Sequence, residues 1–281
     1  MLQAAINDQG QVSPELRSVF VEVSEHCTLP PLPQVAARAL VLVQNPETDF
    51  AEMAEVIEKD PALAARVLRI ASSAFYVRTN PPTTLQDAVR AVGMSGLRDI
   101  IVAAALKPAF DLDDRFHRQL WDHSLATAVA ADTVARTTGA SRGGVAFICG
   151  LLHDAGRLVH HLTNPKAFDE LHMAERDEPS MDEREYFGAS HDVVASCLAW
   201  KWGLDPRISN ALIAHHGEPG QNPGLSAHLI LGDRIARAIQ GDPDEERALS
   251  ASFLAADLDA DPATVVAEVE RNLAENRAFF E

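Results

Sequence analysis

The stretch DPALAARVLRIA (residues 60–71) contains the pattern that decides the fold. Asp60 is a favourable N-cap residue, and Pro61 suits the first helical position because an N–H there would have no helical partner. Apolar residues then recur at i, i+4 and i+7, namely Leu63, Val67 and Ile70. This spacing predicts an α-helix with one buried face.

The same signals recur along the chain. Further N-cap and proline pairs are Ser13-Pro14, Asp205-Pro206 and Asp261-Pro262. Asp49…Glu52 and Thr84…Asp87 resemble capping boxes, and helix stops are expected at Gly93, Gly139, Gly203 and Gly217. The sequence has no Asn-Gly hairpin signal and no sustained alternation of period two. Aromatic residues make up only 6% of the chain, which also disfavours strands. The sequence therefore predicts an all-α fold.

Changes in composition divide the chain into three parts. Short amphipathic helices over residues 29–106, after a proline-rich start (LPPLP, 29–33), predict an N-terminal helical bundle at 1–110. A polar, acidic stretch at 111–115 opens a histidine-bearing helical unit at 111–240. A turn-rich segment then leads into a helical tail at 241–281. Because the linker is short, we expect the first bundle to pack on the second unit.

Composition excludes several classes of function. The 281 residues hold 24 basic and 41 acidic side chains, a net charge of −17, which repels a nucleic-acid backbone. No apolar run is long enough to cross a bilayer, and no apolar segment near the start indicates a secretory signal. The three cysteines are widely spaced, as is typical of a reducing compartment. We expect a soluble cytoplasmic protein that binds neither nucleic acid nor membrane.

The strongest chemical signal is LLHDAGR at residues 151–157. His153 and Asp154 follow the apolar segment 145–152, so both are expected to emerge from a buried helix. A buried carboxylate is costly unless it is paired or bound to a metal. The pair therefore predicts a metal or catalytic site, although a structural role beside a backbone amide would also explain it. Arg157 is expected either to contact a phosphate or to pair with a carboxylate.

Other candidate ligands lie on separate predicted helices. They are His123 on a helix running to about Arg136, His191 at the start of 191–202, His215 and His216 at the end of 206–216, and Asp233 within 229–235. Imidazoles and carboxylates that converge from several helices form the metal sites of helical bundles. Mixed nitrogen and oxygen ligands suit Fe, Mn, Ni or Zn, and more than four ligands suggest two metals.

Structural roles are an alternative for several histidines. His215 and His216 are placed in a last helical turn, where imidazole interacts favourably with the helix dipole. Neighbours on a helix point about 100° apart, so both are expected to reach one site only if two metals are present. His191 would also suit a solvent-facing helix start. The remaining histidines are interpreted as surface or incidental residues: His26, His117, His160, His161, His172 and His228.

These residues resemble known families. The order His123, His153-Asp154, Asp233 is similar to that of the HD superfamily of metal-dependent phosphohydrolases. With His191, His215 and His216 added, the set resembles that of the HD-GYP branch, which hydrolyses cyclic di-GMP. The first half resembles the HDOD family, the HD-related output domain, through LPPLP (29–33), Asp60-Pro61, LRIASSAFY (68–76) and AVRAVG (88–93). This resemblance covers about residues 28–236.

The HDOD resemblance implies an N-terminal helical bundle packed on an HD-like helical bundle and a role in bacterial signal transduction. Many family members lack the HD metal ligands, but this chain has them. It departs from HD-GYP because Gln119 replaces a glutamate, Arg157 replaces a lysine, and residues 217–224 hold no GYP motif. It departs from the usual HDOD sequence because Ser72 stands where asparagine is common.

We therefore predict an HDOD signalling protein whose HD-like half binds one or two divalent metal ions and presents a surface to a protein partner. The alternative is a metal-dependent phosphohydrolase acting on a nucleotide or cyclic dinucleotide. In that reading His153, Asp154 and Arg157 are catalytic. The metal ligands are expected to be His123, His153, Asp154, His191, His215, His216 and Asp233. A third hypothesis is that the protein is a scaffold that binds no metal.

Overall fold

The computed structural model describes residues 12–45, 47–72, 82–111, 113–139, 145–173, 179–219, 224–258 and 260–280. In these ranges the secondary-structure elements are helices and there is no β-strand, so the predicted all-α fold is confirmed. The first group of helices comprises α1 (Pro14–His26), α2 (Gln34–Gln44), α3 (Phe50–Ile57), α4 (Pro61–Ala71) and α5 (Leu85–Leu106), followed by a 3-10 turn, Lys107–Ala109.

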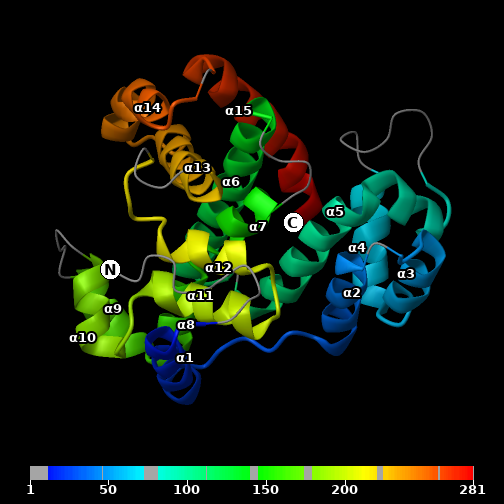
Figure 1. Cartoon of the computed structure of the whole chain (residues 1–281), viewed down its shortest axis with the longest axis horizontal. Coiled ribbons are helices and arrows are strands. Elements are labelled where there is room, and N and C mark those ends of the chain that lie inside the picture. Colours follow the sequence, from blue (N-terminus) through cyan, green and yellow to red (C-terminus); the bar gives the residue numbers. More distant parts are fainter. Residues whose placement is uncertain are drawn as a thin grey trace.

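The remaining helices build the second half and the tail. They are α6 (Arg115–Thr137), α7 (Val145–Leu152), α8 (Ala155–Thr163), α9 (Pro165–Met173), α10 (Pro179–Phe187), α11 (His191–Lys201), α12 (Pro206–Ile213), α13 (Leu225–Ile239), α14 (Pro243–Ala255) and α15 (Pro262–Phe280). In Figure 1, α6, α7 and α13 lie at the centre, α2 to α5 form one flank, and α8 to α11 lie toward the other.

Helix starts agree with the sequence signals. The side chain of Asp60 accepts hydrogen bonds from the backbone N–H groups of Ala62 and Leu63. Thr84 accepts from the N–H of Asp87, and its hydroxyl donates to the Asp87 carboxylate at 2.7 Å. Gly93, expected as a helix stop, has φ 74° and interrupts helical geometry inside α5. These caps fix where each helix begins and which face meets the core.

Two boundaries differ from the prediction. The helix expected over 206–216 ends at Ile213, so His215 and His216 lie in the following turn and Gly217 is not its stop. The helix expected over 191–202 ends one residue earlier, at Lys201. Residues 73–76 of the LRIASSAFY motif, the side chain of Ile70 and residues 220–223 lie outside the described residues.

One large apolar cluster extends across both halves of the chain. It includes buried side chains of α3 and α5 as well as α6, α7 and α13. A second cluster joins α1 to α11, so α1 packs on the histidine-bearing half although it precedes residue 110. The division at residues 110 and 240 stays a prediction.

The central helices approach each other closely through glycines. A Cβ atom at Gly150 of α7 would lie 2.5 Å from the Cα of Ala128 on α6. A Cβ at Gly232 of α13 would lie 2.7 Å from the backbone nitrogen of Ala131, also on α6. Both distances are shorter than a side chain tolerates, so glycine is needed at each crossing. This close packing brings the His-Asp motif and Asp233 next to α6.

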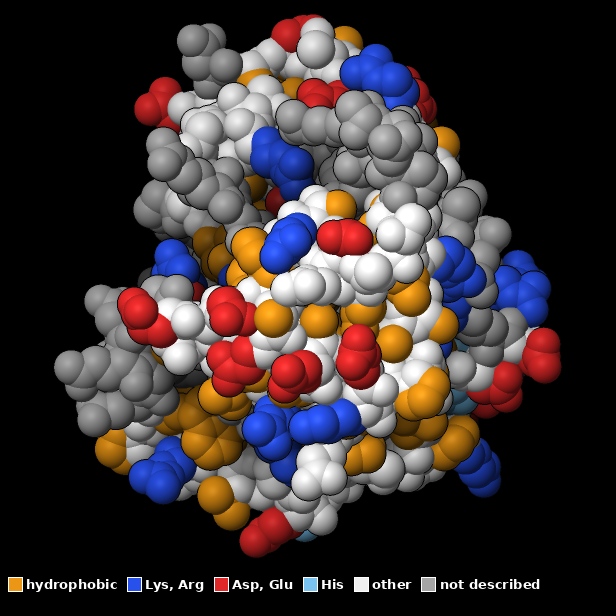
Figure 2. All heavy atoms as spheres, turned by 90° about the vertical axis from the view of Figure 1, so that its right-hand side faces the viewer, with side chains coloured by type: hydrophobic (Ala, Val, Ile, Leu, Met, Phe, Trp, Pro, Cys, Tyr) orange, Lys and Arg blue, Asp and Glu red, His pale blue; other side chains and the backbone are white. Residues whose placement is uncertain are grey.

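Figure 2 presents the face formed by one flank of the molecule. There, acidic and basic side chains are interspersed among apolar ones over the flank formed by α2 to α5. Among the described helices, none combines the length and apolar character that a membrane crossing requires.

Candidate metal centre

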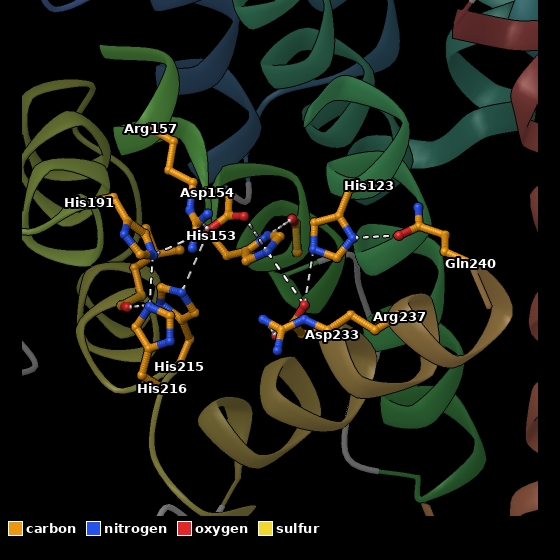
Figure 3. A network of polar contacts seen from close by, with 12 residues as sticks. His123, His153, Asp154, Arg157, His191, His215, His216, Asp233, Arg237 and Gln240 are labelled. Atoms are coloured by element: carbon orange, nitrogen blue, oxygen red, sulfur yellow. Dashed lines mark hydrogen bonds and ion pairs between the residues drawn. The ribbon is translucent and has the colours of Figure 1, made fainter. Parts of the chain in front are cut away.

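Seven side chains predicted as ligands converge at the centre of the second half (Figure 3). His123 comes from α6, His153 follows α7, and Asp154 is the N-cap residue of α8. His191 is the first residue of α11, and Asp233 lies on α13. His215 and His216 occupy the turn after α12. The chain thus brings together residues up to 110 positions apart in sequence, from His123 to Asp233.

The ligand atoms fall into two groups. In the first, His123, His153 and Asp233 place their donor atoms within 4.8 Å of one another. Nε2 of His123 lies 3.0 Å from Oδ1 of Asp233, and Nε2 of His153 lies 3.8 Å from the same oxygen. The second group contains His191, His215 and His216, within the same limit. Each group could hold one metal ion.

Asp154 lies between the two groups. Its Oδ2 is 3.5 Å from Nε2 of His153 in the first group. Its Oδ1 is 3.3 Å from Nε2 of His191 and 3.9 Å from Nε2 of His215 in the second. Each carboxylate oxygen therefore faces a different group, as a bridging ligand between two cations would.

The rings are oriented by hydrogen bonds on their far sides. Nδ1 of His153 donates to the carbonyl of Gly150 at 2.7 Å, and Nδ1 of His215 donates to the carbonyl of Leu212 at 2.6 Å. Nδ1 of His123 donates to Oε1 of Gln240 at 3.0 Å. With Nδ1 protonated, Nε2 of each neutral ring carries a lone pair that faces the centre.

Glu183 completes this pattern and was not predicted from the sequence. Its buried carboxylate oxygen Oε2 accepts from the backbone N–H of His191 at 2.8 Å and from Nδ1 of the same residue at 2.6 Å. Eight positions separate the two residues, and a helix end lies between them. No helical periodicity therefore links them, so the sequence offered no signal.

The donor set fits metal ions. Nε2 of His153 and Nε2 of His215 are buried and have no hydrogen-bond partner within the described part of the chain. Buried polar nitrogens without a partner cost free energy. Lone pairs of imidazole aimed at one another and at carboxylate oxygens repel, and cations placed between them would satisfy both.

The protonation of the centre follows from its electrostatics. Burial opposes the charge of Asp154, but Arg157 and the surrounding histidines hold the pKa of that carboxyl well below its usual range. Burial lowers the pKa of the imidazoles of His153 and His215. Burial and the neighbouring His215 lower the pKa of His216 to about 4. Neutral imidazoles and ionised carboxylates are the forms that bind metals.

Two arginines flank the centre. Nε of Arg157 is 3.2 Å from Oδ1 of Asp154, and Nη2 of Arg237 is 2.7 Å from Oδ2 of Asp233. The Arg157 side chain is 22% exposed, and His216 is exposed as well. Solvent therefore reaches part of Arg157 and His216, at the edge of the second histidine group.

Several expectations for individual histidines were wrong. His215 and His216 lie in the turn after α12 rather than in its last helical turn, and their rings, 3.9 Å apart, belong to one group with His191. His117, His160 and His228 are buried rather than incidental surface residues. His160 stacks on Phe187, and Nε2 of His117 is hydrogen-bonded to His161. The side chain of His172 lies outside the described residues.

We predict that the metal-free protein loses stability as the pH falls from 7 to 5. Burial lowers the folded-state pKa of His153, His191, His215 and His216, so below about pH 6.5 the unfolded chain binds more protons than the folded chain. Each such imidazole costs about 1.4 kcal/mol per pH unit while it stays neutral when folded.

The opposite shift occurs at His123: burial lowers its pKa, but the hydrogen bond to Asp233 and the negative charges of Asp154 and Asp233 together raise it above its usual value. The shift at this one histidine favours the folded protein as the pH falls, whereas the shifts at the four other histidines disfavour it. Urea denaturation of metal-free protein at pH 7, 6 and 5 measures the effect. A free energy of unfolding that stays constant or rises on acidification would contradict the prediction.

Comparison with known proteins identifies the family. The sequence model of the HDOD domain matches residues 29–218. This chain belongs to the HDOD family. The resemblance noted from the sequence is thereby confirmed, and so is the predicted helical fold.

Solved structures of similar fold include two bacterial proteins. A protein of Shewanella amazonensis, provisionally named a phosphohydrolase, is 25% identical with a TM-score of 0.75, covering 95% of this chain and 97% of its own. An HDOD domain protein of unknown function from Geobacter sulfurreducens is 24% identical with a TM-score of 0.69, covering 95% and 96%.

Curated relatives are longer proteins. An uncharacterized protein of Treponema pallidum is 26% identical over 77% of this HDOD chain, which spans 44% of its length. A protein of Opitutus terrae named ribonuclease Y is 26% identical over 56% of the chain, which spans 25% of its length. The chain thus corresponds to less than half of either relative.

Proposed function

We propose that this HDOD protein is a regulatory module of signal transduction whose histidine-bearing half holds two divalent metal ions. The observation that carries the proposal is the position of Asp154, with one carboxylate oxygen toward each histidine group. His123, His153 and Asp233 would hold one ion, and His191, His215 and His216 the other. Mixed imidazole and carboxylate ligands suit Fe, Mn, Ni or Zn.

In this role the metal-loaded half would stabilise one surface for a cytoplasmic protein partner. The seven ligands come from five segments, namely α6, the α7–α8 junction, α11, the turn after α12, and α13. Metal binding would cross-link these helices, because ions that bind only the folded state stabilise it. A nucleotide ligand at the same centre would then change the surface that a partner contacts.

A second candidate function is hydrolysis of a phosphoester in a nucleotide or cyclic dinucleotide. The position of Arg157 favours it, because this partly exposed guanidinium lies next to the shared carboxylate. Two bound divalent ions would supply positive charge for phosphate oxygens and would acidify water. Arg157 would then bind and orient the phosphate, while Asp154 and His153 would hold the centre in place and keep its charge fixed.

Metal analysis tests the first part of the proposal. Protein purified without a chelator or a histidine tag should contain about two ions of iron, manganese, nickel or zinc per chain by elemental analysis. A content near zero, after incubation with each of these ions and removal of excess, would contradict both candidate functions and leave the metal-free scaffold.

A screen of cyclic dinucleotides, nucleotides and generic phosphoesters separates the two candidates. Turnover by the metal-loaded protein that His153→Ala abolishes would establish the hydrolase. No turnover, together with loss of partner binding in His153→Ala, would support the regulatory module. Partner binding unchanged by His153→Ala would contradict a metal-dependent regulatory role.

A further inference from the structure

Glu183 is a buried carboxylate beside the second histidine group and is not among its ligands. It comes from α10, and its side chain is fully buried. Oε2 receives two hydrogen bonds from one residue, His191, through the backbone N–H and through Nδ1 of the ring. Two bonds to one oxygen fix both the start of α11 and the rotation of the ring. Nε2 of His191 is thereby aimed at Asp154 and at Nε2 of His216, 2.7 Å away.

The far-side partner of His191 differs from those of the other oriented imidazoles. His153 and His215 donate to neutral backbone carbonyls, and His123 donates to the neutral amide of Gln240. Among these four rings, His191 alone has a carboxylate partner on its far side, at Nδ1. A carboxylate on the far side of a ligating imidazole makes the ring a stronger donor and typically accounts for a 10- to 100-fold difference in metal affinity.

Charge around the two groups explains why a carboxylate is needed there. The first group has a carboxylate of its own, Asp233, which Arg237 partly neutralises at 2.7 Å. The second group consists of three imidazoles, and Arg157 lies 3.2 Å from the oxygen of Asp154 that faces them. Together with Asp154 and Asp192, Glu183 supplies negative charge that would offset Arg157 beside a divalent ion there.

We propose that Glu183 is a positioning residue that gives the His191–His215–His216 group its metal affinity and has little effect on the His123–His153–Asp233 group. This inference rests on the proposed two-metal function. It predicts that the two groups respond separately to a change at Glu183, although Asp154 joins them.

Titration of metal-free protein with Mn²⁺ tests the proposal. For Glu183→Gln, which preserves size and removes the charge, we expect one ion to bind with wild-type affinity and the second to bind 10- to 100-fold more weakly. With one equivalent of Mn²⁺ more than the two sites can hold, electron paramagnetic resonance should show two magnetically coupled Mn²⁺ ions in the wild type. The variant should show one uncoupled Mn²⁺ ion. The control variant Glu185→Gln changes an exposed carboxylate on the same helix and should bind both ions with wild-type affinity. Wild-type affinity for both ions in Glu183→Gln would overturn the proposal.

The Mn²⁺ titration also distinguishes a failure of the proposed two-metal function from a failure of the proposed role of Glu183. A wild-type chain that binds no Mn²⁺ would contradict the proposed function, whereas a wild-type chain that binds two and a variant that also binds two would contradict only the role of Glu183. The first group serves as an internal control for folding, because an unfolded variant loses both ions.

Nuclear magnetic resonance of the wild-type protein provides a second test of the role of Glu183. Proton resonance of the metal-free protein should show a strongly deshielded Nδ1 proton for His191, because its bond to Glu183 is short and charge-assisted. Zn²⁺ should shift this resonance together with those of His215 and His216. A His191 resonance that does not respond while the other two shift would refute the positioning role.

Discussion

Replacing Asp154 with alanine should reduce bound metal from about two ions per chain to fewer than one. Its two carboxylate oxygens face different histidine groups, at 3.5 Å from His153 and 3.3 Å from His191. Both sites therefore lose a charged ligand from one substitution. Arg157 also loses the carboxylate next to it, which leaves a partly buried positive charge unpaired beside the His191 group.

Elemental analysis of the purified variant and isothermal titration with Mn²⁺ measure the loss. We expect at least a 100-fold decrease in affinity for both ions, since a direct charged ligand matters more than its outer partners. Asp169→Asn, an exposed carboxylate on α9, should leave both ions bound. An Asp154→Ala chain that retains one ion at wild-type affinity would show that Asp154 does not serve both groups.

Gly156→Ala should destabilise the protein by about 3 kcal/mol and weaken metal binding at the His191 group. A Cβ at position 156 would overlap the carbonyl oxygen of His191, with the backbone carbon of that residue 2.6 Å away. Because backbone cannot rotate away as a flexible side chain can, α8 and α11 must separate, and overpacking of this kind costs about 1–3 kcal/mol or more.

Urea denaturation of the metal-free variant measures the loss of stability, and Mn²⁺ titration measures the second effect. Gly203→Ala is the matched control, because Gly203 has φ +67° but nothing within 4 Å of the added Cβ. The control should cost about 1–2 kcal/mol of backbone strain without changing metal affinity. If Gly156→Ala costs no more than the control, α8 and α11 do not pack as closely as the structure indicates.

The sequence predicted most of the helices because their signals are local. Asp60 and Thr84 cap the helices that they were expected to cap, since each side chain bonds N–H groups two or three residues away. The predicted end of α12, at residue 216, was wrong, because the helix ends at Ile213. The backbone N–H groups of Ala214 and His215 bond carbonyls three residues back, as in a turn, and Nδ1 of His215 bonds the carbonyl of Leu212 as well.

The candidate site was predicted in part. Its seven ligands were chosen from the His-Asp motif and the family resemblance, and the structure brings them together; their binding of metal stays a prediction. Glu183 could not be found, because only the corner between α10 and α11 places it against His191. The burial of His160 was missed for a similar reason, since Phe187, on which it stacks, comes from a different helix.

The most direct test of the account is X-ray diffraction from crystals of the metal-loaded protein at the absorption edge of the bound metal. We predict two anomalous peaks per chain on either side of the Asp154 carboxylate. One should lie among His123, His153 and Asp233, and the other among His191, His215 and His216. A single peak, or no peak within bonding distance of Asp154 in crystals that contain the metal, would contradict the two-metal centre.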